Sequence, residues 1–303
     1  MRKPVIHDQD GHADDLVATL LLALYPAVDL RAVVVNSGDC IPQVSAAVLA
    51  ALLDRLGKGA VPVAWQHHAL PHPFPTAWQR ESLNYLRAFP EAERYYPAAA
   101  GTRLLTETIL AAGEPVTLLV TGPCTNLAAA LRAAPEIARH LERVVLMAGG
   151  LEAGGNVAGE QDHDGSAEWN LYCDPPAAAY CLQAGLALDF VSLDVTNFVP
   201  MTARFVETLR SRGGACRLAA ELLAGVEQQN YFFWDTLAAL LTCEPDFLPR
   251  GRRTLTVRTD PPAAGRLEKT ASGVPARVFE PDADVESLGA RVEVRVAEIL
   301  SAL

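Results

Sequence analysis

The sequence predicts an α/β fold in which a single domain, residues 1–303, holds a mainly parallel open sheet flanked by helices. Short apolar runs alternate with longer stretches of helical periodicity, which is the order that right-handed β-α-β crossovers produce. A chain of 303 residues and 32.4 kDa is long enough for one large α/β domain or for two small ones. No linker or internal repeat divides the chain, which favours one domain.

In the first half of the chain, the apolar runs predict strands near 3–8, 29–36, 60–64, 115–121 and 143–147. Helical periodicity between these runs predicts helices over 14–25, 43–56, 103–112 and 125–139. Residues 67–78 are rich in proline and histidine, and we expect a loop there.

In the second half, residues 148–167 contain six glycines. A connection of this length inside a compact domain is typical of a lid or a binding loop. The elements expected after it are a helix over 175–185, a strand over 188–194, two or three helices between 202 and 243, strand segments from Arg252 and a closing helix over 285–300.

The composition excludes several classes of partner. A net charge of -11 and a pI near 5.1 argue against nucleic acid or an anionic membrane, because both favour a basic face. No apolar run reaches the roughly 18 residues of a membrane span, and the N-terminus lacks a signal peptide's apolar core. We therefore expect a soluble cytoplasmic protein. Its six cysteines are scattered without a CxxC pair, so free buried thiols are expected.

The most informative stretch is residues 4–15, where an apolar strand runs into Asp8, Asp10, Asp14 and Asp15. Four carboxylates this close repel one another, and a divalent cation with oxygen ligands is the simplest way to offset the repulsion. Gly11 allows a tight turn before a helix whose first turn holds two of the acids, a placement that suits the helix dipole. The plain alternative is an acidic helix cap, but a cap needs only one carboxylate.

Other polar residues follow the remaining strands. These segments are Asn36 to Asp39, Thr121 to Asn126, Glu168 to Asn170, and Asp235 after an aromatic run. In an open α/β sheet the carboxyl ends of the strands form the crevice that binds ligands. Asp235 by itself can be an ordinary helix cap, whereas with the N-terminal cluster it becomes a further ligand for the same ion.

Taken together, these motifs resemble the inosine-uridine preferring nucleoside hydrolase family. The matching motifs are Asp8-x-Asp10-Gly11-x-x-Asp14-Asp15, Thr121-Gly122-Pro123-x-Thr125-Asn126, Gly155-Asn156, Glu168-x-Asn170 and Trp234-Asp235. They occur in the family's order, and only the region after about residue 250 matches loosely. The resemblance implies the nucleoside hydrolase fold and hydrolysis of an N-glycosidic bond.

The resemblance also implies roles for individual residues. Asp10, Asp15 and Asp235 match calcium ligands, together with a backbone carbonyl that we place at Thr125, with Thr121 as the alternative. Asp10 also matches the general base that takes a proton from the metal-bound water attacking ribose C1′. The residues that match ribose-binding positions are Asp14, Asn156, Glu168 and Asn170. Asp8 fits a supporting role that orients the loop.

The base-binding residues resemble the purine-specific, inosine-adenosine-guanosine branch. Trp234 stands where many members carry a histidine proton donor, and it matches one of two tryptophans that stack the purine. Trp78 is the candidate for the second, its plain alternative being a loop anchor, and Asp39 matches an acidic contact to the base. His12 departs from the asparagine expected in this branch, and His163 is only a weak candidate near the sugar 5′ end.

The predicted activity is therefore calcium-dependent hydrolysis of purine ribonucleosides to free base and ribose, by a homo-oligomer (dimer or tetramer) that binds neither nucleic acid nor membrane. A nonspecific or pyrimidine-acting hydrolase and a non-catalytic nucleoside- or ribose-binding protein remain alternatives. The segment Asp8-x-Asp10-Gly11 also resembles haloacid dehalogenase phosphatases, but the downstream lysine and acidic pair of that family have no candidate. A zinc site at His67, His68 and His72 lacks regular ligand spacing.

Overall fold

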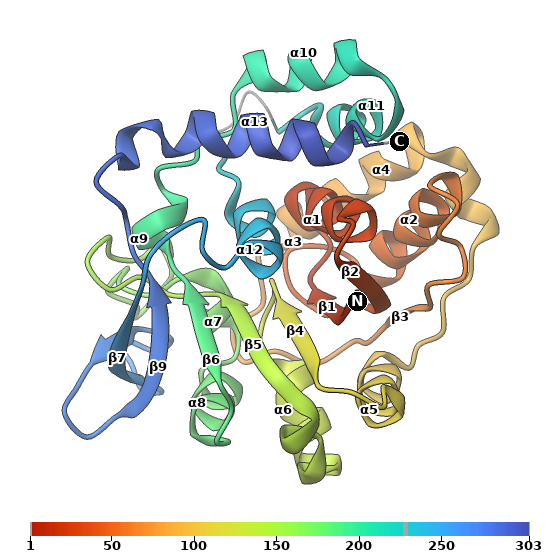
Figure 1. Cartoon of the computed structure of the whole chain (residues 1–303). Coiled ribbons are helices and arrows are strands. Elements are labelled where there is room, and N and C mark those ends of the chain that lie inside the picture. Colours follow the sequence, from red (N-terminus) through yellow and green to blue (C-terminus); the bar gives the residue numbers. More distant parts are fainter. Residues whose placement is uncertain (1, 227–229, 303) are drawn as a thin grey trace.

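A nine-stranded sheet with the order β3-β2-β1-β4-β5-β6-β9-β7-β8 forms the centre of the molecule (Figure 1). The computed structural model describes residues 2–226 and 230–302. The strands are β1 Lys3–Gln9, β2 Val28–Val35, β3 Val63–Trp65, β4 Val116–Val120, β5 Leu141–Met147, β6 Leu188–Val191, β7 Arg250–Val257, β8 Leu267–Lys269 and β9 Val274–Phe279. Strands β1 to β6 are parallel, β9 joins β6 in parallel, and β7 pairs antiparallel with β8 and β9. The prediction of a mainly parallel sheet is confirmed.

Helices cover both faces of the sheet (Figure 1). Helices α1, α2, α11, α12 and α13 pack on one face and α5, α6 and α8 on the other. The α-helices are α1 Ala13–Leu24, α2 Pro42–Arg55, α3 Thr76–Gln79, α4 Leu83–Ala88, α5 Gly101–Ala111, α6 Thr125–Ala133, α7 Trp169–Cys173, α8 Pro175–Gln183, α9 Leu193–Thr196, α10 Ala203–Arg212, α11 Gly214–Leu223, α12 Trp234–Cys243 and α13 Leu288–Leu300. The 3-10 helices are η1 Arg80–Ser82, η2 Pro90–Arg94, η3 Pro135–His140 and η4 Val285–Ser287.

Alternate side chains of the central strands point to opposite faces of the sheet and belong to two separate hydrophobic cores. On β1, Val5 belongs to the core under α1 and α12, whereas Ile6 belongs to the core under α6. Strand β1 is buried from Pro4 onward, because helices cover both faces of a parallel sheet. This two-sided burial explains why the first strands read as continuous apolar runs.

Several predicted boundaries are wrong for local reasons. The helix predicted over 125–139 ends at Ala133, because Pro135 lacks an N–H and keeps Ala134 out of the helical region (φ -144°, ψ 79°). Strand β6 ends at Val191, and the residues predicted to extend it begin α9 instead. The short helices α3, η1, α4 and η2 were not predicted, and the first of them begins at Thr76 inside the expected loop.

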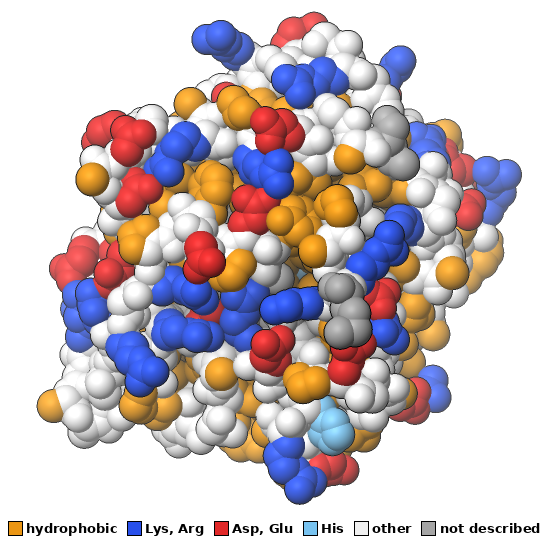
Figure 2. All heavy atoms as spheres, viewed as in Figure 1, with side chains coloured by type: hydrophobic (Ala, Val, Ile, Leu, Met, Phe, Trp, Pro, Cys, Tyr) orange, Lys and Arg blue, Asp and Glu red, His pale blue; other side chains and the backbone are white. Residues whose placement is uncertain are grey.

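Ion pairs between arginines and the buried Asp189 link the C-terminal strands to the parallel sheet. The buried carboxylate of Asp189 on β6 lies 3.6 Å from Arg143 Nη1 of β5 and 3.4 Å from Arg250 Nη1 of β7, and it also pairs with Arg277 Nε of β9. On the face seen in Figure 2, Lys and Arg side chains are interspersed with Asp and Glu side chains. Within residues 2–226 and 230–302, no helix has the length and apolar character needed to cross a membrane.

Candidate active site

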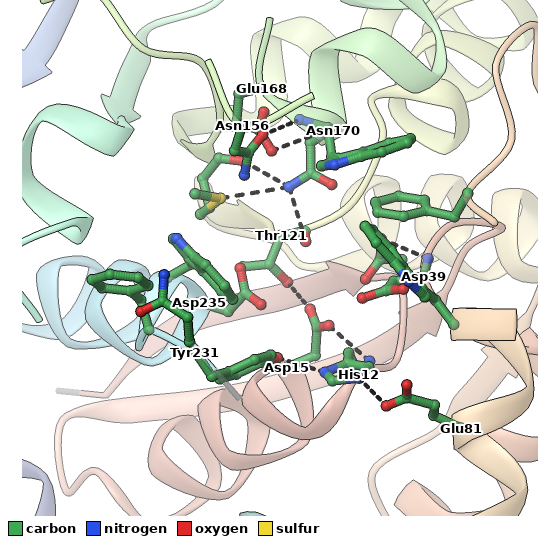
Figure 3. A pocket seen from close by; sticks show the side chains of 18 of the residues that line it. His12, Asp15, Asp39, Glu81, Thr121, Asn156, Glu168, Asn170, Tyr231 and Asp235 are labelled. Atoms are coloured by element: carbon green, nitrogen blue, oxygen red, sulfur yellow. Dashed lines mark hydrogen bonds and ion pairs between the residues drawn. The ribbon is translucent and has the colours of Figure 1, made fainter. Parts of the chain in front are cut away.

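A cavity of about 610 Å³ lies where strands β1, β2, β4 and β5 end (Figure 3). Its walls come from segments far apart in the sequence: the turns after β1 and β2, the α3–η1 segment, the end of β4, the residues around α7 and the segment that leads into α12. A cavity of this volume suits a small molecule, and this edge of the sheet is the one where α/β proteins bind ligands.

Three carboxylates, those of Asp10, Asp15 and Asp235, lie on the cavity wall. Asp10 follows β1, while Asp15 and Asp235 lie in the first turns of α1 and α12. Burial raises the pKa of all three, that of Asp15 to about 7. The charge of Asp15 raises the pKa values of the other two further. The sequence-predicted cluster therefore forms, and its members repel one another.

Two glycines allow the neighbouring turns to pack against Asp10. A Cβ on Gly38 would lie 2.2 Å from Asp10 Oδ2, and a Cβ on Gly122 would lie 2.9 Å from Asp10 Cβ. A larger residue at Gly38 would displace the Asp10 side chain, and one at Gly122 would press on the Asp10 Cβ and backbone. The backbone N–H of Asp39 donates to Asp10 Oδ2 at 3.1 Å. The Asp10 carboxylate is thus held in one position by the chain around it.

Asp15 is held by hydrogen bonds from two other segments. Thr121 Oγ1 donates to Asp15 Oδ1 at 2.5 Å, and the His12 backbone N–H donates to Asp15 Oδ2 at 2.9 Å. Because the Thr121 hydroxyl gives its hydrogen to Asp15, it accepts one from His7 Nε2 at 2.8 Å. Burial lowers the pKa of His7 to about 3, so this imidazole is neutral. His7 is a supporting residue that the sequence analysis missed.

The structure places Thr125, the residue predicted to offer a carbonyl ligand, outside the cavity lining. Thr125 begins α6, its hydroxyl donates to Asp174 Oδ2 at 2.9 Å, and it does not line the cavity. Thr121, the alternative, lines the cavity beside the carboxylates, and its carbonyl accepts from Asn170 Nδ2 at 3.3 Å. Of the two threonines named from the sequence, Thr121 at the end of β4 is therefore the one that lies at the cavity.

Asp14, predicted to bind ribose, lies behind the cavity wall. Its carboxylate accepts from the Asp235 backbone N–H at 2.6 Å and from Thr236 N–H at 3.3 Å, and it also bonds the Thr236 hydroxyl. The side chain is fully buried and is not part of the cavity lining. The structure thus gives Asp14 the task of fixing the N-terminus of α12, which carries Asp235.

We therefore expect Asp14→Ala to destabilise the protein. The change leaves two buried N–H groups of α12 without an acceptor, a cost of about 1–3 kcal/mol, and should lower Tm by roughly 5 °C. Thermal unfolding would measure this, with Asp54→Ala on the protein surface as the control. An unchanged Tm together with a raised KM for nucleosides would instead support the ribose contact that the sequence predicted.

The polar end of the cavity is formed by Asn156, Glu168 and Asn170. Glu168 Oε1 accepts from the Asn170 N–H at 2.8 Å, and Oε2 accepts from the Gly149 N–H at 3.0 Å. Burial raises the pKa of Glu168 to about 7, although these backbone hydrogen bonds oppose the rise. Asn156 Oδ1 accepts from the Trp169 N–H at 3.1 Å. Hydrogen bonds to the backbone thus hold all three side chains in place before any ligand binds.

Aromatic side chains line the cavity in two groups. Trp78 is 41% exposed and meets Trp169 edge to face at 5.3 Å, while Phe74 stacks on Trp169 at 4.7 Å. Trp234 packs against Tyr231 at 4.7 Å, and its buried Nε1 has no hydrogen-bond partner among the described residues. Both tryptophans proposed from the sequence therefore line the cavity, together with aromatic residues that were not predicted.

Two further acidic residues of the cavity wall, Asp39 and Glu81, lie close to His12. Asp39 lines the cavity, and its Oδ1 is buried with no hydrogen-bond partner among the described residues. His12 Nδ1 lies 2.5 Å from Tyr231 Oη, and its Nε2 lies 3.8 Å from Glu81 Oε2. Burial lowers the pKa of His12, but the carboxylates of Asp39, Glu81 and Asp10 outweigh that effect, and the net shift is upward.

Two weaker candidates lie outside the cavity. Asp8 Oδ1 accepts from Asn126 Nδ2 at 2.8 Å, and burial raises the pKa of Asp8 to about 8. His163 bonds the Ala264 carbonyl at 2.9 Å and packs against Tyr172. Neither residue lines the cavity. The supporting role of Asp8 and the sugar contact of His163 stay predictions.

The histidines of the 67–78 loop have separate partners. His67 Nδ1 lies 3.2 Å from Ser37 Oγ, His68 Nε2 lies 2.8 Å from Asn126 Oδ1, and His72 stacks on Tyr172 at 4.4 Å. These partners anchor the loop over the edge of the sheet. Four further cavity residues were not predicted: Phe74, Glu81, Trp169 and Tyr231. Of these, Trp169 and Tyr231 lie within the sequence motifs described above, whereas Phe74 and Glu81 carry no such signal.

The chemistry of the donor set decides which metal fits. No group of three or more His, Cys, Asp or Glu side chains within residues 2–226 and 230–302 is arranged to hold a metal ion by itself. The carboxylates of Asp10, Asp15 and Asp235 and the Thr121 carbonyl offer only oxygen, the ligand atom that calcium and magnesium prefer. A divalent cation would also offset the repulsion that raises their pKa values. These residues therefore fit a hard divalent cation.

Nearly the whole chain is similar to known proteins of one family. Residues 5–297 match the family model described as inosine-uridine preferring nucleoside hydrolase. The pyrimidine-specific ribonucleoside hydrolase RihA of Citrobacter koseri is 30% identical over 227 residues, which cover 74% of this chain and 70% of that protein. An inosine-uridine preferring nucleoside hydrolase from Bacillus anthracis superposes with a TM-score of 0.87 at 30% identity, covering 98% of this chain and 99% of that one.

A purine-preferring ribonucleoside hydrolase from Gardnerella vaginalis also superposes, with a TM-score of 0.78. It covers 99% of this chain and 100% of its own, but its sequence identity is only 22%. At that identity the likeness concerns the fold alone.

Proposed function

The chain belongs to the inosine-uridine preferring nucleoside hydrolase family, whose members hydrolyse the N-glycosidic bond of ribonucleosides, and from this premise we propose that it prefers purine ribonucleosides and uses calcium. The products would be the free base and ribose. Family membership excludes the haloacid dehalogenase phosphatase alternative. The homodimer or homotetramer and the cytoplasmic location stay predictions of the sequence.

One cavity brings the carboxylates of Asp10, Asp15 and Asp235 together with polar and aromatic side chains, and this arrangement carries the proposal (Figure 3). Asn156, Glu168 and Asn170 offer hydrogen-bond partners for ribose hydroxyls. Trp78 and Trp234 offer faces for a planar base. A nucleoside with its ribose against these polar residues and its base against a tryptophan would have its glycosidic bond in the same cavity as the carboxylates.

The residues that would hold calcium are Asp10, Asp15, Asp235 and the carbonyl of Thr121. A bound divalent cation would lower the pKa of a water molecule and fix its position. Asp10, held by the glycine turns and the Asp39 N–H, accepts the proton of the attacking water as general base. Glycosidic cleavage passes through a positively charged sugar, which the buried carboxylates stabilise electrostatically.

The proposed preference for purines depends on Trp78 and Trp234 in the cavity wall. Two indole rings give a bicyclic purine more stacking area than a pyrimidine, and Asp39 Oδ1 is a buried acceptor free to meet a base N–H. The relative from Citrobacter koseri is named pyrimidine-specific, so a pyrimidine-acting enzyme is the second candidate. The tryptophan pair is the feature that favours purines in this chain.

Base release from inosine, guanosine, adenosine, uridine and cytidine tests the preference. We expect kcat/KM for the purine ribonucleosides to exceed that for uridine by at least about tenfold, and Trp78→Ala to remove most of this difference through lost stacking, about 1 kcal/mol. Trp65→Phe, outside the cavity, is the matched control. Equal rates on uridine and inosine would overturn the purine preference but not the family activity. Tight nucleoside binding without base release would favour the binding-protein alternative.

A further inference from the structure

His12 lies on the cavity wall between residues of two other segments (Figure 3). It directly precedes α1, and its side chain is only 7% exposed. Its Nδ1 lies 2.5 Å from the hydroxyl of Tyr231, and its Nε2 lies 3.8 Å from a carboxylate oxygen of Glu81. Both partners line the same cavity, so the ring is held between two of its walls.

The partners of His12 determine which nitrogen carries a hydrogen. An ionised carboxylate only accepts hydrogen bonds, so the nitrogen that faces Glu81, Nε2, carries an N–H. The Tyr231 hydroxyl can both donate and accept, so it can hydrogen-bond to Nδ1 whether or not that nitrogen carries a hydrogen. The 3.8 Å separation from Glu81 is longer than a hydrogen bond, so this Nε2–H can still donate to a ligand at the end of the cavity that contains Asp39 and Glu81.

This end of the cavity is electrostatically unfavourable for a departing base. When the glycosidic bond breaks, its electron pair moves onto the base, and negative charge develops there. Asp39 and Glu81 are carboxylates, and as ions they offer acceptors and repulsion but no hydrogen. A donor aimed at the base offsets this charge, as donors in an oxyanion hole do. His12 provides such a donor between these acids.

Building on the proposed function, we propose that His12 donates a hydrogen bond through Nε2–H to a ring nitrogen of the departing base, and that Tyr231 is a positioning residue that holds the imidazole in place. Water oxygen forms the new bond to C1′ and its proton passes to Asp10. The C1′–N bond breaks, and its electron pair goes to the base. The base then takes a proton from solvent, and Asp10 returns one. His12 stabilises the charge that exists before that proton arrives.

Two substrates with different leaving groups test the proposal. Inosine releases a base that needs stabilisation, whereas 4-nitrophenyl β-D-ribofuranoside releases a phenolate that is stable by itself. With inosine we expect His12→Ala to lower kcat about 100-fold and Tyr231→Phe about tenfold, because each removes or misplaces one donor. With the nitrophenyl riboside both variants should stay within about threefold of the wild type.

The nitrophenyl riboside also serves as the folding control, because a variant that cleaves it has an intact ribose and carboxylate site. His12→Ala keeps the backbone N–H that bonds Asp15, so the start of α1 is preserved. His140→Ala and Tyr180→Phe, outside the cavity, are the matched controls and should change neither rate. An equal loss on both substrates, or no loss on inosine, would overturn the role of His12. If the wild type released no base from any nucleoside, the proposed function itself would fail.

Discussion

Replacing Asp10 by Asn is expected to lower kcat for ribonucleosides by about 10³-fold while raising the Tm of the metal-free protein. The amide keeps the size of the carboxylate and still accepts from the Asp39 N–H, so the glycine turns around it have no reason to move. It has no basic oxygen to take a proton from water. It also removes one charge from a group of mutually repelling, buried carboxylates, which relieves the folded state.

Base release and thermal unfolding in chelator, measured on the same preparations, check both parts of this expectation. Asp29→Asn is the matched control, because Asp29 pairs with Arg31 on the protein surface and should change neither quantity by much. A normal kcat in Asp10→Asn would refute the general-base assignment. A lost activity accompanied by a lower Tm would show that Asp10 is needed for structure rather than for chemistry.

Removing divalent cations with a chelator should abolish base release. The metal-free protein should also lose stability as the pH rises. Buried carboxylates give the sign of the pH effect. The pKa of Asp15 rises from 3.8 to about 7 and that of Asp8 to about 8 in the folded protein. Between pH 3.8 and these raised pKa values, the two carboxyl groups keep protons in the folded state that they have lost in the unfolded state. The contribution of these two carboxyl groups to stability is therefore full below about pH 4 and is lost as the pH rises toward 8.

Thermal unfolding across pH 5–8, with chelator and then with added calcium, measures this effect. We expect Tm in chelator to be roughly 5 °C lower at pH 8 than at pH 5. Calcium at about 100 times its Kd should add about 2.7 kcal/mol and largely remove the decline. Magnesium and zinc at equal concentration serve as comparisons, because the all-oxygen donor set disfavours zinc. A Tm that rises with pH in chelator, or base release that survives chelation, would contradict the cation site.

The parts of the fold that the sequence predicted correctly depend on local patterns. Apolar runs that alternate with helical periodicity are visible without knowledge of any contact, and β1, β2, β4 and β5 follow them within a few residues. The motif spacing likewise placed Asp10, Asp15 and Asp235 in one group, because acids after parallel strands meet at the same edge of a sheet. The boundary at Pro135 was predictable in principle, since proline limits the residue before it.

The parts that were wrong or missed depend on which segments meet in space. Thr121 and Thr125 lie in one motif, but only the end of β4 reaches the cavity, whereas the helix that follows turns Thr125 toward Asp174. Asp14 and Asp15 are adjacent in the sequence, but successive helix positions point in different directions, so one supports α12 and the other faces the cavity.

The sequence by itself determined the α/β class, the family and the carboxylate cluster, because these follow from periodicity and from motifs within short stretches. Only the tertiary structure decided that Tyr231 and Glu81 lie on either side of His12, and that Trp78 and Trp234 line one cavity. These residues come from turns whose positions are set by how helices pack on the sheet. No local pattern encodes that packing, since it depends on the whole core.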